Sequence, residues 1–315
     1  MGSRLLSSLD ECLEEAVKVA SERKPTLVVA GAEDPVTVGS VWEACRRDMV
    51  NPLLVGEVAR IEEAVEKVGA DPSRFEIAGC RADREEVISL ALDLIQQNEA
   101  SLLMKGRLNT GQLLGAYLDK KWDFRAGRFL SHIGVFDAPG EKKLMMITDG
   151  GLNLVPDLER KRDILCNAVD LAHLLGIETP RVAVLAHVEK SPNRELPMIH
   201  DAEELTRENR EGLITGCFVD GPLAFDNAVS KEAAKRKGIS GPVAGRADIL
   251  LAAEIGMGNV IYKVVQTWCN GTIAGIVTGG KIPVMVPSRA DTEKSKLCAI
   301  ALGVLMASAW NTGEE

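Results

Sequence analysis

Two short stretches of the chain combine cationic and hydroxyl side chains in a way that suits phosphate binding. In the first, Ser288-Arg289 supplies a hydroxyl and a guanidinium that can hold two phosphate oxygens at once. The pair stands where a strand passes into a helix, and the N–H groups at a helix start favour anions. A structural interpretation competes, because Ser288-x-x-Asp291 also fits a capping box that only satisfies the helix terminus. Residue chemistry alone leaves both open.

The second stretch, Lys105-Gly106-Arg107-Leu108-Asn109-Thr110, also follows a strand and precedes a helix. Asn109 or Thr110 would be the N-cap, and two cations lie at the mouth of the turn. We expect this run to form a second wall of the same anion pocket, although a solvated loop with an ordinary cap explains the residues equally well. It lacks the spacing of a Walker A loop.

A third stretch, Gly256-Met257-Gly258-Asn259, superficially begins a dinucleotide-binding fingerprint, but Ile261 stands where the third glycine is required. Its glycines let the backbone approach a ligand closely, with Asn259 and Lys263 available for polar contacts. A tight strand-to-helix turn is the competing interpretation. The four histidines and seven cysteines show no metal-ligand, triad or Cys-x-x-Cys spacing, so we expect no metal site.

The elements that must position these stretches alternate between short aliphatic runs and longer segments of helical period, which is typical of βαβ units and a mostly parallel sheet. We therefore expect a doubly wound α/β domain at the start of the chain. The expected strands there are 26–30, 53–55, 75–78 and 101–104, and the expected helices are 36–47, 58–68 and 84–97. Two apolar runs, 129–136 and 144–148, flank a Pro-Gly turn and should pair antiparallel near a domain junction.

The alternation resumes after this hairpin. The expected helices are 161–175, 198–209, 224–237 and 260–268, and the expected strands are 182–186, 214–219, 249–252, 273–277 and 283–286. The clearest helix is the last, where Leu297, Ile300, Ala301, Val304 and Leu305 fall on one face of a 3.6-residue period.

Size and composition exclude several function classes. A chain of 315 residues is twice a typical domain and can bury an ample core. Its net charge of −9 works against broad, sequence-independent nucleic-acid binding, but a small anion can still bind locally. The apolar run from Leu297 to Trp310 has 14 residues and is too short to cross a bilayer. The odd, scattered cysteines suggest no disulfide framework, so we expect a cytoplasmic protein with neither nucleic-acid nor membrane partners.

Several motifs taken together resemble the phosphate acetyl- and butyryltransferases. They are the block from Val219 to Ala233 that contains Asp220-Gly221-Pro222-Leu223, the run Ala247-Asp248-Ile249-Leu250-Leu251, the pattern Gly258-Asn259-x-x-Tyr262-Lys263, and Ser288-Arg289-Ala290-Asp291. The resemblance extends from about Asp34 to Met306, and its Asp-Gly-Pro-Leu and Ser-Arg-Ala-Asp blocks look closer to the butyryltransferases. Because the other motifs of the family occur in the same chain, Ser288 and Arg289 are better interpreted as phosphate-side residues than as a helix cap.

The resemblance implies two doubly wound α/β domains like those of isocitrate and isopropylmalate dehydrogenases, with an active-site cleft between them. The expected domains are 1–139 plus 285–315 on the phosphate side and 140–284 on the CoA side. It also implies a homodimer or higher homo-oligomer that moves a short acyl group, butyryl or similar, between CoA and inorganic phosphate by direct attack in a ternary complex. Acyl-CoA is then a substrate, and we expect no tightly bound cofactor.

The same resemblance carries roles onto single residues. Ser288 and Arg289 are expected to be catalytic, and Asp291 is the best candidate for the proton acceptor. The phosphate pocket should be lined by Lys105, Asn109, Thr110 and Ser131, and CoA should lie toward Gly258, Asn259 and Lys263.

Two departures from the family pattern keep alternatives open. Ser295 replaces a carboxylate that acetyltransferases carry seven residues after the motif serine, and Ala253-Glu254-Ile255-Gly256-Met257 stands where Pro-Asp-Ile or Pro-Asp-Leu commonly precedes Gly-Asn. The alternatives are an acetyl-CoA enzyme, a non-catalytic acyl-CoA-binding protein and a decarboxylating dehydrogenase of the same fold. The last needs a dinucleotide site and clustered carboxylates, and the sequence has neither in recognisable spacing.

Overall fold

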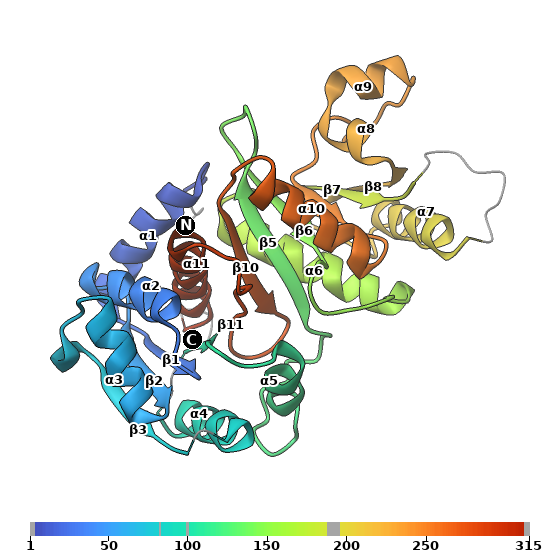
Figure 1. Ribbon diagram of the computed structural model, residues 1–315. Coiled ribbons are helices and arrows are strands. Elements are labelled where there is room, and N and C mark those ends of the chain that lie inside the picture. Colours follow the sequence, from blue (N-terminus) through green and yellow to red (C-terminus); the bar gives the residue numbers. More distant parts are fainter. Residues whose placement is uncertain (1–3, 82, 99–100, 188–195, 312–315) are drawn as a thin grey trace. The chain divides into compact units, whose positions relative to one another are not determined.

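The computed structural model describes residues 4–81, 83–98, 101–187 and 196–311. In these ranges the chain is a mixed α/β protein whose strands pair mostly in parallel (Figure 1). It divides into two units. The terminal unit comprises Leu9–Arg128 and Ala274–Glu315, and the middle unit comprises Phe129–Ile273 with the first eight residues. None of the helices in the described ranges is both long and apolar enough to cross a membrane.

The terminal unit is built on a sheet flanked by helices. Its strands are β1 (Thr26–Ala30), β2 (Asn51–Gly56), β3 (Glu76–Gly79), β4 (Leu102–Lys105), β10 (Ile273–Thr278, whose first residue belongs to the middle unit) and β11 (Val284–Met285). Its helices are α1 (Leu9–Glu22), α2 (Pro35–Arg46), α3 (Val58–Lys67), α4 (Arg84–Asn98), α5 (Thr110–Tyr117) and α11 (Glu293–Asn311), with a 3-10 turn at Pro72–Arg74.

The strand order in this unit is β3-β2-β1-β4-β11-β10, and the pairs are parallel except β11 with β10. Every residue of β4 is buried, as expected for a parallel strand covered on both faces. Ala30 at the end of β1 pairs with Lys105, and Met104 pairs with Met285 at the end of β11. The loops after β1, β4 and β11 therefore leave from one edge of the sheet, where open α/β sheets bind ligands.

The last helix is buried, as its apolar face predicts. α11 packs against α1 and α2 (Figure 1), and Ile300, Ala301 and Leu302 are fully buried. The sequence prediction had no helix at α1. Its buried residues Leu9, Cys12, Leu13, Ala16 and Ala20 have helical spacing, so the sequence does carry the signal for this helix.

The middle unit contains the predicted antiparallel hairpin followed by parallel strands. Its strands are β5 (Ser131–Asp137), β6 (Leu144–Thr148), β7 (Arg181–Leu185), β8 (Phe218–Leu223) and β9 (Ile249–Leu251), in the order β5-β6-β9-β7-β8. Its helices are α6 (Leu158–Leu174), α7 (Pro197–Arg210), α8 (Phe225–Val229), α9 (Lys231–Arg236) and α10 (Ile255–Thr267). The single helix expected over 224–237 is split at Ser230, which is extended and caps α9 by accepting the N–H of Ala233 at 3.3 Å.

The division into units differs from the expected domain boundaries at residues 1–8, 129–139 and 274–284. A junction at 139/140 falls in the turn of the β5-β6 hairpin, whose two strands are held together from Ile133↔Thr148 to Asp137↔Leu144. A junction at 284/285 falls inside β11, which pairs with β4 of the terminal unit. The observed division, at Arg128/Phe129 and Ile273/Ala274, leaves the hairpin and β11 whole.

Candidate anion site

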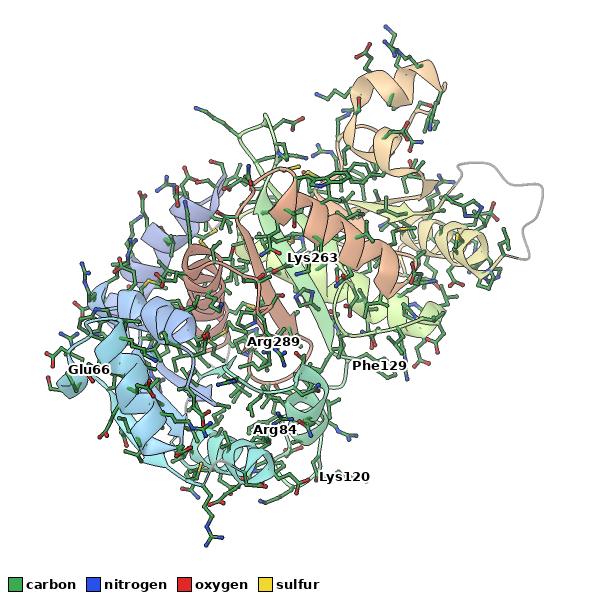
Figure 2. The ribbon with its side chains drawn as sticks, viewed as in Figure 1. Glu66, Arg84, Lys120, Phe129, Lys263 and Arg289 are labelled. Carbon is green, nitrogen blue, oxygen red and sulfur yellow. The ribbon has the colours of Figure 1, made fainter. Side chains whose placement is uncertain are left out.

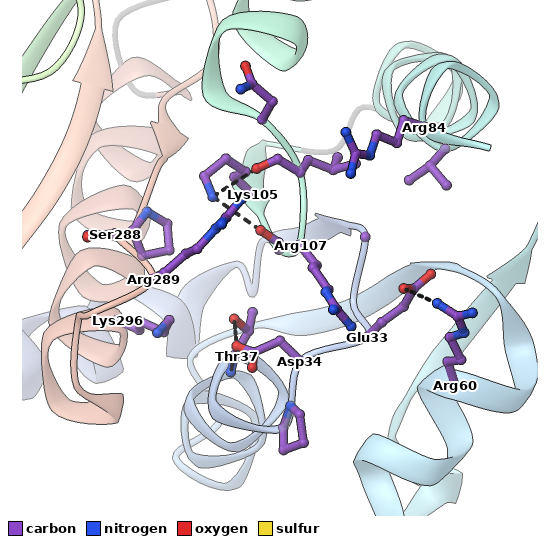
Figure 3. A pocket seen from close by; sticks show the side chains of 17 residues that line it. Glu33, Asp34, Thr37, Arg60, Arg84, Lys105, Arg107, Ser288, Arg289 and Lys296 are labelled. Atoms are coloured by element: carbon purple, nitrogen blue, oxygen red, sulfur yellow. Dashed lines mark hydrogen bonds and ion pairs between the residues drawn. The ribbon is translucent and has the colours of Figure 1, made fainter. Parts of the chain in front are cut away.

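The loops after β1, β4 and β11 line a pocket of about 660 Å³ within the terminal unit (Figure 3). Lys105, Asn109, Ser288 and Arg289, which two separate motifs proposed as phosphate-side residues, lie together on its wall. The basic side chains that line it are Arg60, Arg84, Lys105, Arg107, Arg289 and Lys296, against the acidic Glu33 and Asp34. This excess of positive charge suits an anionic ligand.

Three arginines of the pocket form no ion pair in the part of the chain that the structure describes. The guanidinium groups of Arg84, Arg107 and Arg289 make no ion pair or hydrogen bond with any residue in the described part of the chain. Arg84 is the first residue of α4, and Arg289 precedes α11; both are labelled in Figure 2. Arg60 differs, because its guanidinium lies 2.8 Å from Glu57 and 3.6 Å from Glu33. Three uncompensated guanidinium groups in one pocket are well suited to bidentate phosphate contacts.

Two lysines add positive charge that is withdrawn from water. Lys105 is 6% exposed and its Nζ donates to the carbonyl oxygens of Gly106 at 3.2 Å and Leu108 at 3.4 Å. Lys296 is 3% exposed and its Nζ donates to the carbonyl oxygen of Asp291 at 2.9 Å. Burial lowers the pKa of Lys105, and the positive charges of Arg289 and Lys296 lower it further. An anion between these groups would relieve their mutual repulsion.

We expect the affinity for inorganic phosphate to fall as the pH rises toward 10.5, because the lowered pKa of Lys105 makes it lose its proton before an ordinary lysine does. The effect on stability has the opposite sign. Between the lowered folded pKa and the unfolded one, the unfolded chain binds more protons, so the free energy of unfolding contributed by Lys105 rises with pH. Calorimetric titration with phosphate across this range measures the affinity. An equally steep pH dependence in Lys105→Met would show that another group causes it.

Arg289 stands at the tip of a tight turn. The N–H of Asp291 donates to the carbonyl oxygen of Ser288 at 3.1 Å, and the N–H of Ser288 donates to Oδ2 of Asp291 at 2.7 Å. α11 starts only after this turn, and the hydroxyl of Thr292 accepts the N–H of Ser295 at 3.1 Å, as an N-cap does. The capping-box interpretation of Ser288 and Asp291 is therefore wrong, because these residues close a turn ahead of the helix.

The loop after β4 is hydrogen-bonded directly to the loop after β1. The N–H of Gly106 donates to the carbonyl oxygen of Ala30 at 2.8 Å, and the N–H of Arg107 donates to that of Gly31 at 2.8 Å. A Cβ at position 106 would lie 2.0 Å from the oxygen of Gly31, so only glycine fits. Asn109 then caps α5 by accepting the N–H of Gln112 at 3.2 Å. This contact fixes the two walls of the pocket relative to each other.

Gly106→Ala is expected to lower the free energy of unfolding by about 2–3 kcal/mol, because the methyl group must push the two loops apart. Gly115→Ala is the matched control, since a Cβ there meets nothing within 4 Å on helix α5. It should stabilise the protein by about 0.4–1 kcal/mol. Urea unfolding of both variants measures the difference, and equal stabilities would contradict the close approach.

Two other predicted phosphate contacts do not line this pocket. Thr110 is the first residue of α5, and Ser131 is in the middle unit at the start of β5. Ser131 is fully buried, and its hydroxyl accepts a hydrogen bond from Nδ2 of Asn167 at 3.0 Å.

The predicted CoA-side residues lie at the start of α10 in the middle unit. Glu254 caps this helix through the N–H groups of Gly256 at 2.7 Å and Met257 at 2.8 Å. The glycine at 258 allows contact with the protein's own backbone, because a Cβ there would lie 2.3 Å from the carbonyl oxygen of Asp149. Asn259 is exposed and donates from Nδ2 to the oxygen of Gly150 at 3.0 Å. The Gly-Met-Gly run is thus the first turn of a helix docked on a neighbouring loop.

Lys263, one turn further along α10, carries the only positive charge among the predicted CoA contacts (Figure 2). Its Nζ lies 3.3 Å from Oε1 of Gln266 and 5.1 Å from the centre of the Tyr262 ring. The side chain is only partly buried, so it can meet an anionic group of a ligand.

Several pocket residues were absent from the sequence prediction, namely Glu33, Asp34, Arg60, Arg84 and Lys296. Asp34-Pro35 before a helical period was a visible signal, but it indicates a helix start as readily as a site. Lys296 directly precedes the apolar face that begins at Leu297, which was a second visible signal, and the structure shows that it is buried. Arg60 and Arg84 come from α3 and α4, and no local pattern marks them.

Comparison with known proteins gives consistent results. The family model described as phosphate acetyl/butaryl transferase matches residues 81–304. A phosphate acetyltransferase of Thermotoga maritima is 37% identical over 295 residues, 94% of this chain and 99% of that protein. A phosphate butyryltransferase of Clostridium acetobutylicum is 37% identical over 303 residues, 96% and 99% of the two chains. The crystal structure of a branched-chain phosphotransacylase from Enterococcus faecalis matches with a TM-score of 0.78 at 27% identity, covering 90% of this chain and 99% of that one. The chain therefore belongs to the phosphate acetyl/butyryltransferase family.

Proposed function

We propose that this protein transfers a short acyl group, butyryl or similar, between coenzyme A and inorganic phosphate, giving an acyl phosphate. Family membership supports the class of reaction, that of a phosphate acyltransferase. The observation that carries the phosphate side is the pocket in which the guanidinium groups of Arg84, Arg107 and Arg289 form no ion pair with any described residue. Buried Lys105 and Lys296 strengthen the same positive field.

The reaction balances when it is written for monohydrogen phosphate. A phosphate oxygen attacks the thioester carbonyl carbon and forms the new C–O bond, and the C–S bond breaks with its electron pair left on sulfur. Monohydrogen phosphate loses one proton and the CoA sulfur gains one, so the protons balance. The tetrahedral intermediate bears an oxyanion, which fixed cations and N–H donors stabilise by about 3–4 kcal/mol each. Direct attack in a ternary complex also converts two bimolecular encounters into one oriented step.

Each residue of the proposed site has a role that follows from its group. Arg289, held by its turn, would grip two phosphate oxygens, and the Ser288 hydroxyl beside it would contact the phosphate or the oxyanion. Lys105 would neutralise the phosphate charge. Asn109, Thr110 and Ser131 stay predicted phosphate contacts. Asp291 stays the candidate proton acceptor; it is 4% exposed, and its Oδ2 already accepts the N–H of Ser288, but a carboxylate has further lone pairs that can take a proton.

We place CoA, as a substrate rather than a resident cofactor, at the first turns of α10. Its contacts would be Gly258, Asn259 and Lys263, with the Lys263 ammonium facing a phosphate group of CoA. The active-site cleft between two domains, as in isocitrate and isopropylmalate dehydrogenases, stays a prediction for this chain. So do the homodimer and the cytoplasmic location.

The decisive experiment measures thiol release from acetyl-, propionyl-, butyryl- and isobutyryl-CoA in the presence of phosphate. Butyryl- or isobutyryl-CoA should give the highest kcat/KM. Highest activity with acetyl-CoA would instead favour the acetyltransferase, and identity does not decide between them, because the acetyl and butyryl relatives are both 37% identical. CoA binding by calorimetry without thiol release from any substrate would support a non-catalytic acyl-CoA-binding protein and defeat the proposal.

A further inference from the structure

Asp34 is a carboxylate in a pocket otherwise suited to anions. It follows the β1 loop and caps α2, with Oδ2 accepting the N–H of Thr37 at 2.9 Å and its hydroxyl at 2.7 Å. Within the described ranges, no donor is hydrogen-bonded to its second oxygen, Oδ1, and no cation forms an ion pair with it. Figure 3 shows Asp34 at the N-terminus of α2, and it lines the same pocket as Lys105 and Arg289.

The other carboxylate of this pocket is compensated differently. Glu33 lies 3.6 Å from the guanidinium of Arg60, so part of its charge is neutralised by the protein. Asp34 is hydrogen-bonded, among the described residues, by the two uncharged donors of Thr37, and it interacts with Lys105 only through a longer-range charge attraction rather than an ion pair. A fully ionised tetrahedral anion at Lys105 and Arg289 would therefore meet lone pairs of Asp34 with no proton between the two negative groups, which is unfavourable in a partly buried site.

We propose that Asp34 selects phosphate over sulfate by accepting a hydrogen bond from the P–O–H group of monohydrogen phosphate. This inference rests on the proposed function. Sulfate has nearly the same size and shape and the same double negative charge, but near neutral pH it carries no proton to donate. A hydrogen bond to an ionised acceptor contributes about 1.5–3 kcal/mol, which corresponds to tenfold or more in relative affinity. The cations of the pocket bind either anion, and the Asp34 carboxylate discriminates phosphate from sulfate.

The competing explanation is that Asp34 only caps α2. Asn and Ser are as good at the N-cap position as Asp, so Asp34→Asn and Asp34→Ser keep the cap and remove the charge. A purely structural role predicts that both variants behave as the wild type. A role in selecting phosphate predicts a change in the ratio of two affinities, which a general loss of stability does not produce.

The experiment measures the inhibition constant of sulfate and the KM of phosphate in the thiol-release assay. For Asp34→Asn, the ratio of the sulfate constant to the phosphate KM should fall at least about tenfold relative to wild type. Arsenate, which also keeps a proton near neutral pH, is the matched ligand control, and it should lose affinity together with phosphate, so that the arsenate-to-phosphate ratio is unchanged. Asp157→Asn is the matched variant control, because Asp157 caps α6 through the N–H of Arg160 at 2.9 Å in the middle unit and should leave both ratios unchanged.

The outcomes separate the two proposals. An unchanged sulfate-to-phosphate ratio in both Asp34→Asn and Asp34→Ser overturns the inference while leaving the transfer reaction intact. Absence of thiol release in the wild type overturns the proposed function. The inference is then tested by calorimetric titration with phosphate and with sulfate, without CoA, where the same tenfold change in their ratio is expected and an unchanged ratio overturns it.

Discussion

Arg289→Lys is expected to lower kcat/KM for acyl transfer by about 10²-fold while leaving the protein folded. Lysine keeps the positive charge, but its ammonium is a single point that cannot reproduce the two parallel N–H contacts of a guanidinium. The turn that presents Arg289 is closed by backbone and Asp291 contacts, so shortening the side chain does not disturb it. Steady-state rates with the best acyl-CoA at varied phosphate concentration measure the loss, and thermal unfolding verifies that the variant is folded.

Arg47→Lys is the matched control for this change. Arg47 is exposed at the end of α2, and its guanidinium Nε lies 2.8 Å from Glu43 on the same helix. Such surface pairs contribute little, so this variant should keep its rate within about twofold. A near-normal rate for Arg289→Lys as well would show that the residue only shapes its turn.

The helices and strands could be predicted from the sequence where the period of the hydrophobic residues and the length of the segment indicate the same kind of element. β1 was predicted at its observed bounds, and the β5-β6 hairpin followed from two apolar runs around a Pro-Gly turn. β8 was expected over 214–219 but lies at Phe218–Leu223, because Gly221-Pro222 looks like an end to a strand. The order of strands places β8 last, and an edge strand tolerates proline since one of its sides needs no donors.

Residues of the candidate site could be predicted only where a suitable side chain also lies at the end of a strand or in the loop after it. Lys105 ends β4 and Arg289 lies in the loop after β11, and the shared edge of a parallel sheet brings such residues together. Arg60 and Arg84 enter the pocket from helices, so their proximity depends on how those helices pack. Sequence patterns that concern a single element cannot reveal it.

Helix caps and ligand contacts use the same residue types, which limits what a local pattern can decide. Ser288 fitted a capping box but lies ahead of α11, where Thr292 caps instead. Asp34 does cap α2, and it lines the pocket as well. The choice between cap and contact therefore depends on where the helix starts and on what else lies around the side chain.

Lys105→Met is expected to raise the KM for phosphate about tenfold to a hundredfold without lowering the stability of the protein by more than about 1 kcal/mol. Lys105 is withdrawn from water, and its ammonium contacts two carbonyl oxygens but no carboxylate within the described ranges. Its pKa is lowered, so the fold does not favour its charged form. Methionine fills the same space without that cost. A charge that the fold does not favour is best explained by a ligand that uses it.

Lys161→Met is the matched control, because Lys161 is a buried lysine that is paired with a carboxylate. Lys161 is as buried as Lys105, but its Nζ lies 2.7 Å from Oδ2 of Asp201, which is also buried. Removing this lysine leaves a buried carboxylate with His200 Nδ1, 3.3 Å from its other oxygen, in place of a lysine ammonium, at a cost of about 3–5 kcal/mol in the free energy of unfolding. Urea unfolding should therefore show a large loss for Lys161→Met and almost none for Lys105→Met. Phosphate titration of the folded variants should show the reverse, and a large loss of stability for Lys105→Met would identify it as a structural residue instead.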